Sequence, residues 1–397
     1  MIYKYLLTQP YFDDTEIQKV KECLDSKWVT QGAMTEQFEK LFMKKHGGDY
    51  AVAVCNCTAG LHMALIALGI GAGDEVLVPA YTWITSANCI EYVGAKAVFV
   101  DIDYRTFNID PEKMEERITE KTKAVVVVHE FGCAADMDKI MAVAKKHSLK
   151  IIEDCACAIG TVYKGKPVGT FGDIGVFSFH PRKVITTGEG GMCITADREI
   201  AKKLQILRNH GGVVDTEAVE YGKPYYMGEY NILGYNFRLS DIQAAVGVAQ
   251  MDKLEELLRE RKECAEYYIK LLEDNADIIL PMNHKEYGPT YQSFVLLLKM
   301  QLKEIRNPLM IALQKEGIQT KQGTHAVHRL GYYKNKYGIK EIDYPIAAYC
   351  EDCSVTLPIF PKMQREQQEM IVLKLCEKMD LLVKKNNTIE DEVIKMK

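Results

Sequence analysis

Between about residue 50 and residue 195, short apolar runs alternate with segments of helical periodicity. The apolar runs are AVAVC, EVLVP, KAVFVD, KAVVVVH, LKIIED and IGVFSF, and the segments between them include TAGLHMALIALGI and MDKIMAVAKKHS. Apolar runs of this length are typical of strands that are buried on both faces, and helices between them favour parallel connections. The pattern therefore predicts an α/β fold with a large, mostly parallel sheet flanked by helices.

Helical patterns flank this block on both sides. DDTEIQKVKECLDS and MTEQFEKLFMKKH precede it, and each has acids near its start and lysines near its end, which suits the helix dipole. After the block, a long helical stretch begins with LSDIQAAVG and leads to the strand-like SFVLLLKM and further helical segments. We therefore predict a large domain over residues 1–250 and a smaller α/β domain over residues 251–397. The polar segment NNTIEDEVIKMK is expected to fray.

Charge and hydropathy argue against several classes of partner. The 397 residues carry a formal net charge of -5, and the lysines and arginines are interspersed with acids rather than gathered into a basic tract. This composition indicates neither nucleic acid nor an anionic membrane as a partner. No apolar run reaches the roughly 18 residues that a membrane span needs, and the first residues do not have the pattern of a signal peptide. We expect a cytoplasmic protein that acts on a small molecule.

The 12 cysteines raise the question of disulfides and metal sites. Most lie inside apolar runs of a long chain, which is typical of packed thiols in a reducing compartment. Among the closely spaced pairs, only Cys350 and Cys353 have the two-residue gap of a zinc knuckle, and no second pair of that spacing follows them. We therefore assign no metal.

Ligands of open α/β sheets gather where the carboxyl ends of strands meet helix starts, so the residues after each predicted strand are the first candidates. In AVAVCNCTAGLHMAL a strand ends near Cys55 and a helix begins near Thr58. The free backbone amides of Cys57, Thr58 and Ala59, at the positive end of that helix, would bind a phosphate. A threonine that only caps the helix explains the same segment about equally well.

Two further strands end in candidate residues. Trp83 follows EVLVP, and a flat ring there can stack on a planar ligand, although a core tryptophan is the more common reason for one. LKIIED ends in Glu153 and Asp154, and strand alternation directs one of these acids inward or to the carboxyl edge of the sheet. A buried carboxylate needs a cation. The alternative is a surface acid that caps the following helix.

The stretch FSFHPRKVITTGEGG contains the residue with the most specific chemistry. Pro181 ends the preceding strand, so Lys183 lies where the chain leaves the sheet. A lysine that is desolvated beside another cation, here Arg182, loses its proton and forms a Schiff base with a carbonyl. The alternative is an ordinary solvated lysine.

Together these segments supply a phosphate-binding helix start, a stacking aromatic ring, an acid that needs a cation and a Schiff-base lysine. Pyridoxal 5'-phosphate requires one such partner each for its phosphate, ring face, pyridinium nitrogen and aldehyde. A nicotinamide-binding site is a weaker explanation, because no GxGxxG motif follows the first strand of a βαβ unit.

Several long motifs in a fixed order resemble one family. WVTQG near residue 30, GDEVLVPAYTW, IEDCACAIG, FSFHPRKVITTGEGGM, RNHGG and GYNFRLSDIQAAVG resemble the DegT/DnrJ/EryC1/StrS aminotransferases of sugar biosynthesis, and the resemblance covers nearly the whole chain. It implies fold type I, with a large sheet domain and a smaller C-terminal α/β domain. It also implies a homodimer that binds pyridoxal phosphate and transfers an amino group.

The resemblance assigns roles to residues at matching positions. Lys183 is in the place of the lysine that forms the Schiff base, and Asp154 is in that of the acid bound to the pyridine nitrogen. Trp83 matches the stacking ring. Phosphate contacts are implied for Cys57, Thr58, Ala59 and Ser178, and for Asn236, which reaches the cofactor of the partner subunit. Thr30, in WVTQG, is assigned to the substrate.

Two positions distinguish branches of the family. Relatives often have glutamine or histidine three residues after the aspartate, near the phenolic oxygen of the cofactor. This chain has Cys157 there, a cofactor contact that is a much weaker hydrogen-bond donor. Relatives that remove a hydroxyl have histidine in place of the lysine, so Lys183 favours transamination.

His325 and His328, in QGTHAVHRLGYY, are candidate contacts of the substrate in the second domain. Two histidines three residues apart on a helix also suit a metal or simple packing, so these alternatives stay open here.

The function expected from these residues is transfer of an amino group, with glutamate as the donor by family resemblance. The acceptor would be the keto group of a nucleotide-linked deoxysugar, as in amino-sugar and surface-glycan biosynthesis. A transaminase of a cyclic ketone such as an inosose would need the same cofactor site. A third alternative is a non-catalytic sensor of pyridoxal phosphate or a sugar nucleotide, although a sensor has no need of Lys183, Asp154 and Ser178 together.

Overall fold

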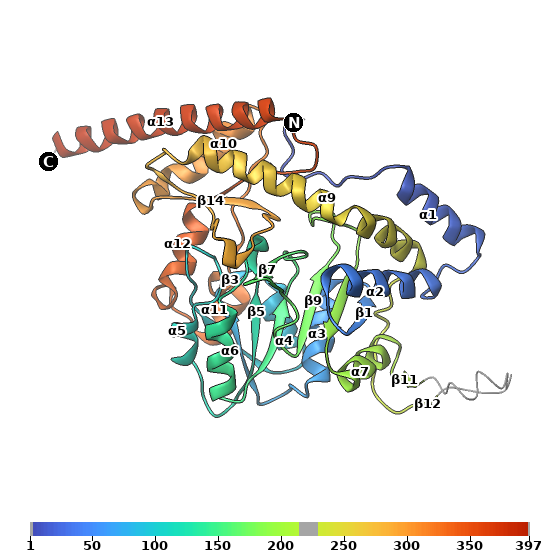
Figure 1. The fold of residues 1–397 in the computed structure, drawn as a ribbon. Coiled ribbons are helices and arrows are strands. Elements are labelled where there is room, and N and C mark those ends of the chain that lie inside the picture. Colours follow the sequence, from blue (N-terminus) through green and yellow to red (C-terminus); the bar gives the residue numbers. More distant parts are fainter. Residues whose placement is uncertain (1–2, 214–228, 396–397) are drawn as a thin grey trace.

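The structure, a computed structural model, describes residues 3–213 and 229–395 and is centred on a seven-stranded sheet (Figure 1). The strand order is β1-β10-β9-β6-β5-β2-β4. The strands are β1 (Tyr50–Val54), β2 (Glu75–Pro79), β4 (Lys96–Val100), β5 (Thr122–Val128), β6 (Lys150–Asp154), β9 (Ile174–Ser178) and β10 (Gly191–Thr195). From β9 to β4 the pairing is parallel, whereas β10 is antiparallel to both of its neighbours. The predicted mostly parallel sheet is confirmed.

The antiparallel strand β10 is the one strand of this sheet that the sequence pattern does not predict. Its residues GMCIT directly follow the glycine cluster TTGEGG, which is typical of a loop. The strand lies between β1 and β9, so it brings the ends of these two strands together at one edge of the sheet.

Helices cover both faces of the sheet. They are α1 (Asp14–Asp25), α2 (Ala33–His46), α3 (Cys57–Ala67), α4 (Thr85–Tyr92), α5 (Pro111–Glu115), α6 (Met137–Lys146), α7 (Arg198–Arg208) and α9 (Asp241–Leu272). Alternate residues of β5 belong to two different cores, as expected for a strand that is buried on both faces. Val126 packs in the core that includes α3 and α4, and Val125 and Val127 pack in the core that includes α2, α6 and the first half of α9.

The C-terminal part contains a smaller, antiparallel sheet in the order β13-β14-β16. Its strands are β13 (Ile278–Ile279), β14 (Phe294–Leu298) and β16 (Ser354–Leu357), and its helices are α10 (Arg306–Lys315), α11 (Gly331–Tyr337), α12 (Pro345–Cys353) and α13 (Arg365–Lys395). The short strands β3 (Tyr81–Thr82) and β15 (His325–Ala326) pair with each other. This pair joins the segment that follows β2 to the C-terminal part of the chain. None of the described helices is both long and apolar enough to cross a membrane.

Short elements complete the fold. The strands are β7 (Val162–Tyr163), β8 (Lys166–Pro167), β11 (Gly212–Val213) and β12 (Glu229–Tyr230), and the 3-10 helices are η1 (Glu130–Gly132), η2 (Lys285–Tyr287), η3 (Met300–Ile305), η4 (Val327–Arg329) and η5 (Glu341–Asp343).

The long helix α9 runs from α1 and α2 at one side of the molecule to β14 and α10 at the other (Figure 1). The predicted domain boundary at residue 250 therefore lies inside one continuous helix. The N-terminal segment also crosses between the parts, because Tyr5 forms a bridge with Ile318. The segment NNTIEDEVIKMK belongs to α13 as far as Lys395, and its last two residues lie outside the described residues, so its fraying stays a prediction.

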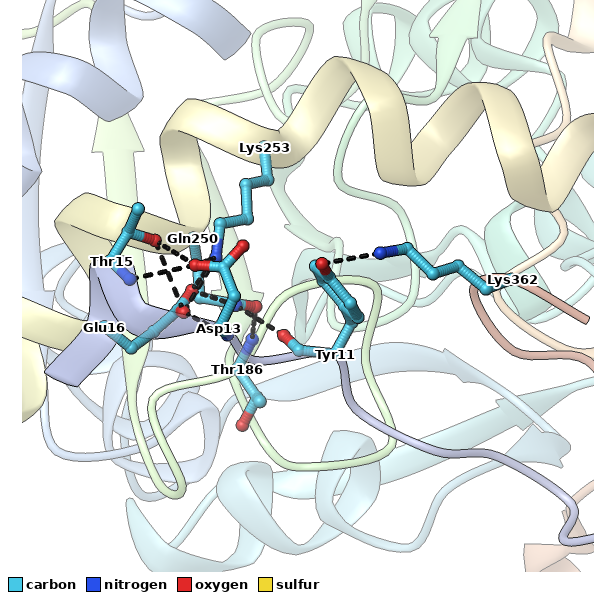
Figure 2. A network of polar contacts seen from close by, with 8 residues as sticks. All are labelled: Tyr11, Asp13, Thr15, Glu16, Thr186, Gln250, Lys253 and Lys362. Carbon is cyan, nitrogen blue, oxygen red and sulfur yellow. Dashed lines mark hydrogen bonds and ion pairs between the residues drawn. The ribbon is translucent and has the colours of Figure 1, made fainter.

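A polar network, with Glu16 and Gln250 buried at its centre, fixes α1 to α9 (Figure 2). Asp13 and Glu16 form a capping box at the start of α1. The Lys253 ammonium on α9 binds both carboxylates, at 2.6 Å from Asp13 and 2.7 Å from Glu16, and the Gln250 amide donates to Glu16 at 2.7 Å. The network extends beyond the two helices, because the amide of Thr186 donates to the side-chain oxygen of Gln250 at 3.3 Å. Helix α1 is thereby linked to the loop that begins with Lys183.

Candidate active site

Lys183 lies beyond the carboxyl end of β9, in the chain that leaves the sheet after Pro181. Its ammonium is 3.1 Å from the sulfur of Cys157. Burial acts to lower the pKa of Lys183, but the acidic groups Cys157, Cys57 and Asp154 raise it by more, so the net shift is upward. Arg182 has an exposed side chain. The expected lowering of the Lys183 pKa beside Arg182 is not what this arrangement gives, because the neighbouring acidic groups outweigh burial.

Asp154 ends β6 and is 4% exposed. Its carboxylate accepts a hydrogen bond from the Ser86 hydroxyl at 2.7 Å and one from the Ala156 amide at 3.0 Å. Burial raises the pKa of Asp154, although these two hydrogen bonds and the charge of Lys183 act against it. Both donors are neutral, so a protonated pyridine nitrogen would supply the cation that a buried carboxylate needs. The surface-cap alternative for this acid is wrong.

The adjacent Glu153 points to the other face of the sheet and has a different role. Its carboxylate accepts from the His129 ring at 3.0 Å and from the amides of Gly169, Phe171 and Gly172 at 2.7 to 2.8 Å. The Ala135 amide donates to Nδ1 of His129, so the Nε2 hydrogen of a neutral ring points to Glu153.

Glu153, His129 and Cys155 lie close enough together to suit a metal ion. The carboxylate and ring atoms are already used in the hydrogen bonds of this loop, and burial raises the pKa of the Cys155 thiol well above its ordinary value. A metal ligand would have to be the thiolate. We therefore interpret this cluster as structural.

The start of α3 lies beside the same edge of the sheet. Asn56 is its N-cap and accepts from the Ala59 amide at 2.9 Å, so the alternative that Thr58 caps the helix is wrong. The Ala59 amide is thus engaged within the protein. Among the described residues no acceptor bonds the amides of Cys57 and Thr58, so these two donors are available to a phosphate group.

Gly191 and Ser178 form a register pair next to this helix start. A Cβ atom on Gly191 would lie 2.8 Å from the backbone nitrogen of Cys57 and 2.9 Å from the carbonyl oxygen of Phe177. A glycine is therefore required for β10 to pass the start of α3. Ser178 ends β9 and is half-buried, which leaves its hydroxyl near the predicted phosphate position.

Trp83 follows β3 and is 52% exposed, so the alternative of a core tryptophan is wrong. Its ring lies 5.6 Å from the His325 ring, and the ammonium of Lys321 lies 5.4 Å from its centroid. An exposed ring in this position is suited to stacking on a planar ligand.

The two predicted substrate histidines belong to different elements and do not lie on one helix. His325 belongs to β15 and lies beside Trp83, whereas His328 belongs to η4 and is 1% exposed. The His328 ring packs on Tyr344 at 4.8 Å. The protein covers the His328 ring, whereas the His325 ring is partly exposed, and the predicted substrate contact of His328 stays a prediction.

The remaining predicted residues lie on the surface of the chain. Thr30 is exposed in the segment before α2, and Asn236 is exposed and forms a bridge with Asn209. Their predicted contacts with a substrate and with a partner subunit stay predictions.

Sequence reasoning does not find three polar residues of this site: Thr82, Ser86 and Glu130. Ser86 binds Asp154 from a helix, and Glu130 directly follows the strand KAVVVVH. The rule that ligand contacts follow parallel strands would have found Glu130, since it comes two residues after Val128.

The doubly covered sheet and the residues at its carboxyl edge define a pyridoxal-phosphate-dependent aminotransferase of fold type I. A lysine amine, a buried carboxylate without a bonded cation, free helix-start amides and an exposed ring fit the four parts of that cofactor. The sequence model of the DegT/DnrJ/EryC1/StrS aminotransferase family matches residues 10–376, and the chain belongs to this family.

Similar proteins match over nearly their whole length. GDP-perosamine synthase from Escherichia coli O157:H7 is 38% identical over 378 residues, which are 94% of this chain and 97% of that protein. The spore coat polysaccharide biosynthesis protein SpsC from Bacillus subtilis (strain 168) is 38% identical over 367 residues, 91% of this chain and 94% of that protein. Spr1654 from Streptococcus pneumoniae, solved in its PLP form, has a TM-score of 0.89 and 29% identity, and the match covers 95% of this chain and 99% of that chain.

Proposed function

We propose that this aminotransferase moves an amino group from glutamate to the keto group of a nucleotide-linked deoxysugar, in the cytoplasm, for amino-sugar or surface-glycan biosynthesis. The names of two similar proteins, GDP-perosamine synthase and a spore coat polysaccharide biosynthesis protein, support this substrate class.

The observation that carries the proposal is a cationic pocket beside the cofactor lysine. It is lined by Leu7, Thr8, Arg182, Gln292, Ser293, Lys321, Gln322, Gly323, Thr356, Leu357 and Ile359. None of these described lining residues is a carboxylate, so the charges of Arg182 and Lys321 are not neutralised within the pocket. Burial and the charge of Arg182 lower the pKa of Lys321, as expected for two cations that line one pocket. An anionic ligand such as a sugar diphosphate would relieve this repulsion.

Each residue at the carboxyl edge then has a defined task. Bound pyridoxal phosphate supplies an electron sink and carries the amino group between two half-reactions. Lys183 would hold the aldehyde of the cofactor, and its Nζ would move the proton at the α carbon of the amino donor. Asp154 would keep the ring nitrogen protonated, and Trp83 would stack on the ring.

Further contacts come from the surroundings of the ring. The amides of Cys57 and Thr58 and the Ser178 hydroxyl bind the phosphate, and Asn236 reaches the phosphate in the site of the partner subunit. His325 lies beside Trp83 and is therefore proposed to contact the sugar, together with Thr30.

The first experiment is an absorbance spectrum of the purified protein before and after glutamate is added, followed by a panel of acceptors. We expect a visible band that glutamate converts to a near-ultraviolet band, and turnover with a nucleotide-linked keto sugar but not with a free cyclic ketone. If the enzyme turns over an inosose and no nucleotide-linked sugar, its acceptor is a carbocycle rather than a sugar. Bound cofactor without amine exchange would favour the sensor.

The pocket has its own test. Lys321→Gln is expected to raise KM for the nucleotide-linked sugar about 10-fold or more, because it removes one charged contact to a phosphate. Lys202→Gln, on the exposed face of α7, is the matched control and is expected to leave KM unchanged. If KM for glutamate rises instead, the pocket binds the donor carboxylate.

A further inference from the structure

Arg261 is a buried cation to which the proposed function gives no task. It lies within the long helix α9 and is 1% exposed, and it is among the largest side chains that the protein encloses fully. Charged side chains are almost never buried to this extent unless an opposite charge pairs with them. A buried arginine without such a partner therefore requires an explanation.

The hydrogen-bond partners of Arg261 are backbone carbonyl groups. Its Nη1 donates to the carbonyl oxygen of Gln292 at 3.1 Å and to that of Ile359 at 3.3 Å. A third and longer bond reaches the carbonyl oxygen of Tyr291 at 3.4 Å. In the described parts of the chain no carboxylate forms an ion pair with Arg261, and its Nε has no partner. Carbonyl dipoles solvate the guanidinium but do not compensate its charge.

The acidic group that acts on Arg261 is the thiol of Cys264, one turn further along α9. Burial raises the pKa of this thiol to about 12, although Arg261 acts to lower it, so the thiol is neutral near pH 7. Burial also lowers the pKa of Arg261 to about 10, with Cys264 acting against it. The guanidinium is therefore protonated at neutral pH and carries a positive charge inside the protein.

Two of the three carbonyl groups belong to the wall of the cationic pocket that we propose for the substrate. Gln292 and Ile359 both line this pocket, and they come from different segments, one before β14 and the other after β16. One guanidinium thus joins α9 to two sides of the pocket. Its charge lies one hydrogen bond behind the wall.

The same wall is bonded to the chain that carries the cofactor lysine. The side-chain amide of Gln292 donates to the carbonyl oxygen of Arg182 at 2.8 Å. Arg182 directly precedes Lys183, and it is one of the two cations that line the pocket. A shift of Gln292 would therefore move a charge of the pocket together with its wall.

We propose that Arg261 is a positioning residue of the substrate pocket, which fixes two sides of its wall and adds a third positive charge that attracts the diphosphate of the nucleotide-linked sugar without touching it. This inference rests on the proposed function, because the pocket has to bind an anion. A buried charge acts across a short distance with less screening than a surface charge. A guanidinium that the protein already fixes also needs no reorganisation when the ligand binds.

The test is equilibrium binding of inorganic pyrophosphate to the holoenzyme, in which the cofactor occupies the other phosphate site. We expect Arg261→Met to weaken this binding about 10-fold, because the substitution removes the charge and keeps much of the side-chain volume. Arg306→Met is the matched control and should bind like the wild type. Arg306 is 7% exposed at the start of α10, its Nε likewise has no partner among the described residues, and it does not line the pocket.

Arg261→Lys separates the charge from the packing. A lysine at this buried position should have a pKa well below its ordinary value, so it is charged at about pH 6 and largely neutral at about pH 9. The dissociation constant of this variant, divided by that of the wild type at the same pH, should rise about 5- to 10-fold over this range. The division removes the titrations of Lys321 and of pyrophosphate itself, which both proteins share. A guanidinium that only holds the wall together predicts a ratio that does not change with pH.

The outcomes separate this inference from the proposed function. If wild-type holoenzyme binds pyrophosphate and Arg261→Met binds it equally well, the inference is overturned and the pocket stands. A ratio for Arg261→Lys that does not change with pH also overturns it, and this variant alone decides if Arg261→Met does not fold. A wild-type holoenzyme that does not bind pyrophosphate overturns the anion pocket of the proposed function, and this inference with it.

Discussion

At the scale of single residues, the two adjacent acids at the end of β6 have different roles. Glu153 and Asp154 point to opposite faces of β6, because side chains of a strand alternate. Glu153 is saturated by hydrogen bonds within the protein and stabilises a loop. Asp154 accepts from the Ser86 hydroxyl, the Ala156 amide and the Cys57 thiol, and none of these donors is a cation, so the carboxylate is left for a charged ligand group.

Ser86 should determine how well Asp154 serves this purpose. Ser86→Ala removes a buried hydrogen bond to a charged group, so cofactor affinity is expected to fall roughly 10- to 100-fold. The measurement is equilibrium titration with pyridoxal phosphate. Thr85→Ala, one position earlier on α4, is the control and should bind like the wild type; equal affinities for both variants would show that Ser86 does not support Asp154.

Lys183 is the residue without which no cofactor chemistry is expected. Lys183→Ala should bind pyridoxal phosphate without the visible band and show no turnover, because no amine remains to attach the aldehyde. The spectrum and a glutamate exchange assay measure both effects. Repeated turnover by this variant without an added amine would contradict the assignment.

At the scale of elements, β10 determines the geometry of the phosphate-binding helix start. Gly191→Ala would place a methyl group within 3 Å of the backbone of Asn56 and Cys57, so strand or helix must shift. We expect a loss of stability of about 1–3 kcal/mol and a clear loss of cofactor affinity. Thermal unfolding and cofactor titration measure these effects. Gly71→Ala, whose nearest neighbour is a carbonyl oxygen at 3.8 Å, should change neither.

The network between α1 and α9 predicts a pH dependence of stability. Burial acts to raise the pKa of Glu16, but hydrogen bonds from the Asp13 amide, Lys253 and Gln250 outweigh it, so the net pKa lies below 4.5 (Figure 2). A group whose pKa is lowered by folding stabilises the protein above its unfolded pKa, and this contribution is lost as the pH falls through the folded pKa.

Glu16→Gln tests this dependence. At neutral pH we expect a loss of about 2 kcal/mol in the free energy of unfolding, because a charged hydrogen-bond acceptor is removed. The difference from the wild type should shrink as the pH falls below about 4.5. Urea unfolding at several pH values measures it. A difference that does not change with pH would mean that Glu16 acts through packing alone.

At the scale of the whole molecule, the proposed dimer predicts that two inactive variants can complement each other. Asn236→Ala should weaken cofactor binding in the partner's site, and Lys183→Ala should inactivate its own. A hybrid of the two variants would contain one site with intact Lys183 and intact Asn236. Mixing the two purified variants should therefore restore cofactor affinity and turnover to part of the sites. If each variant keeps its defect after subunit exchange is verified, Asn236 does not act across the interface.

Much of this architecture can be predicted from the sequence because it depends on local patterns. Apolar runs and helical periodicity predict the parallel strands and the helices between them, and strand ends predict where Trp83, Asp154 and Lys183 lie. Contacts between distant segments cannot be read in this way. Ser86 is 68 positions from the acid that it binds, and the burial of His328 against Tyr344 depends on how η4 packs. Strand β10 is missed because its glycines resemble a loop.

The position of β1 in the sheet also has a consequence for synthesis of the chain. β1 is at the edge and pairs with β10 alone, from Tyr50 opposite Thr195 to Val54 opposite Gly191. While the ribosome makes the residues between them, β1 has no partner strand, and the helix start that follows it has no fixed place. A nascent chain that ends before residue 191 already contains Lys183 and Asp154. We expect it not to hold the cofactor's phosphate until β10 emerges and joins β1 to β9.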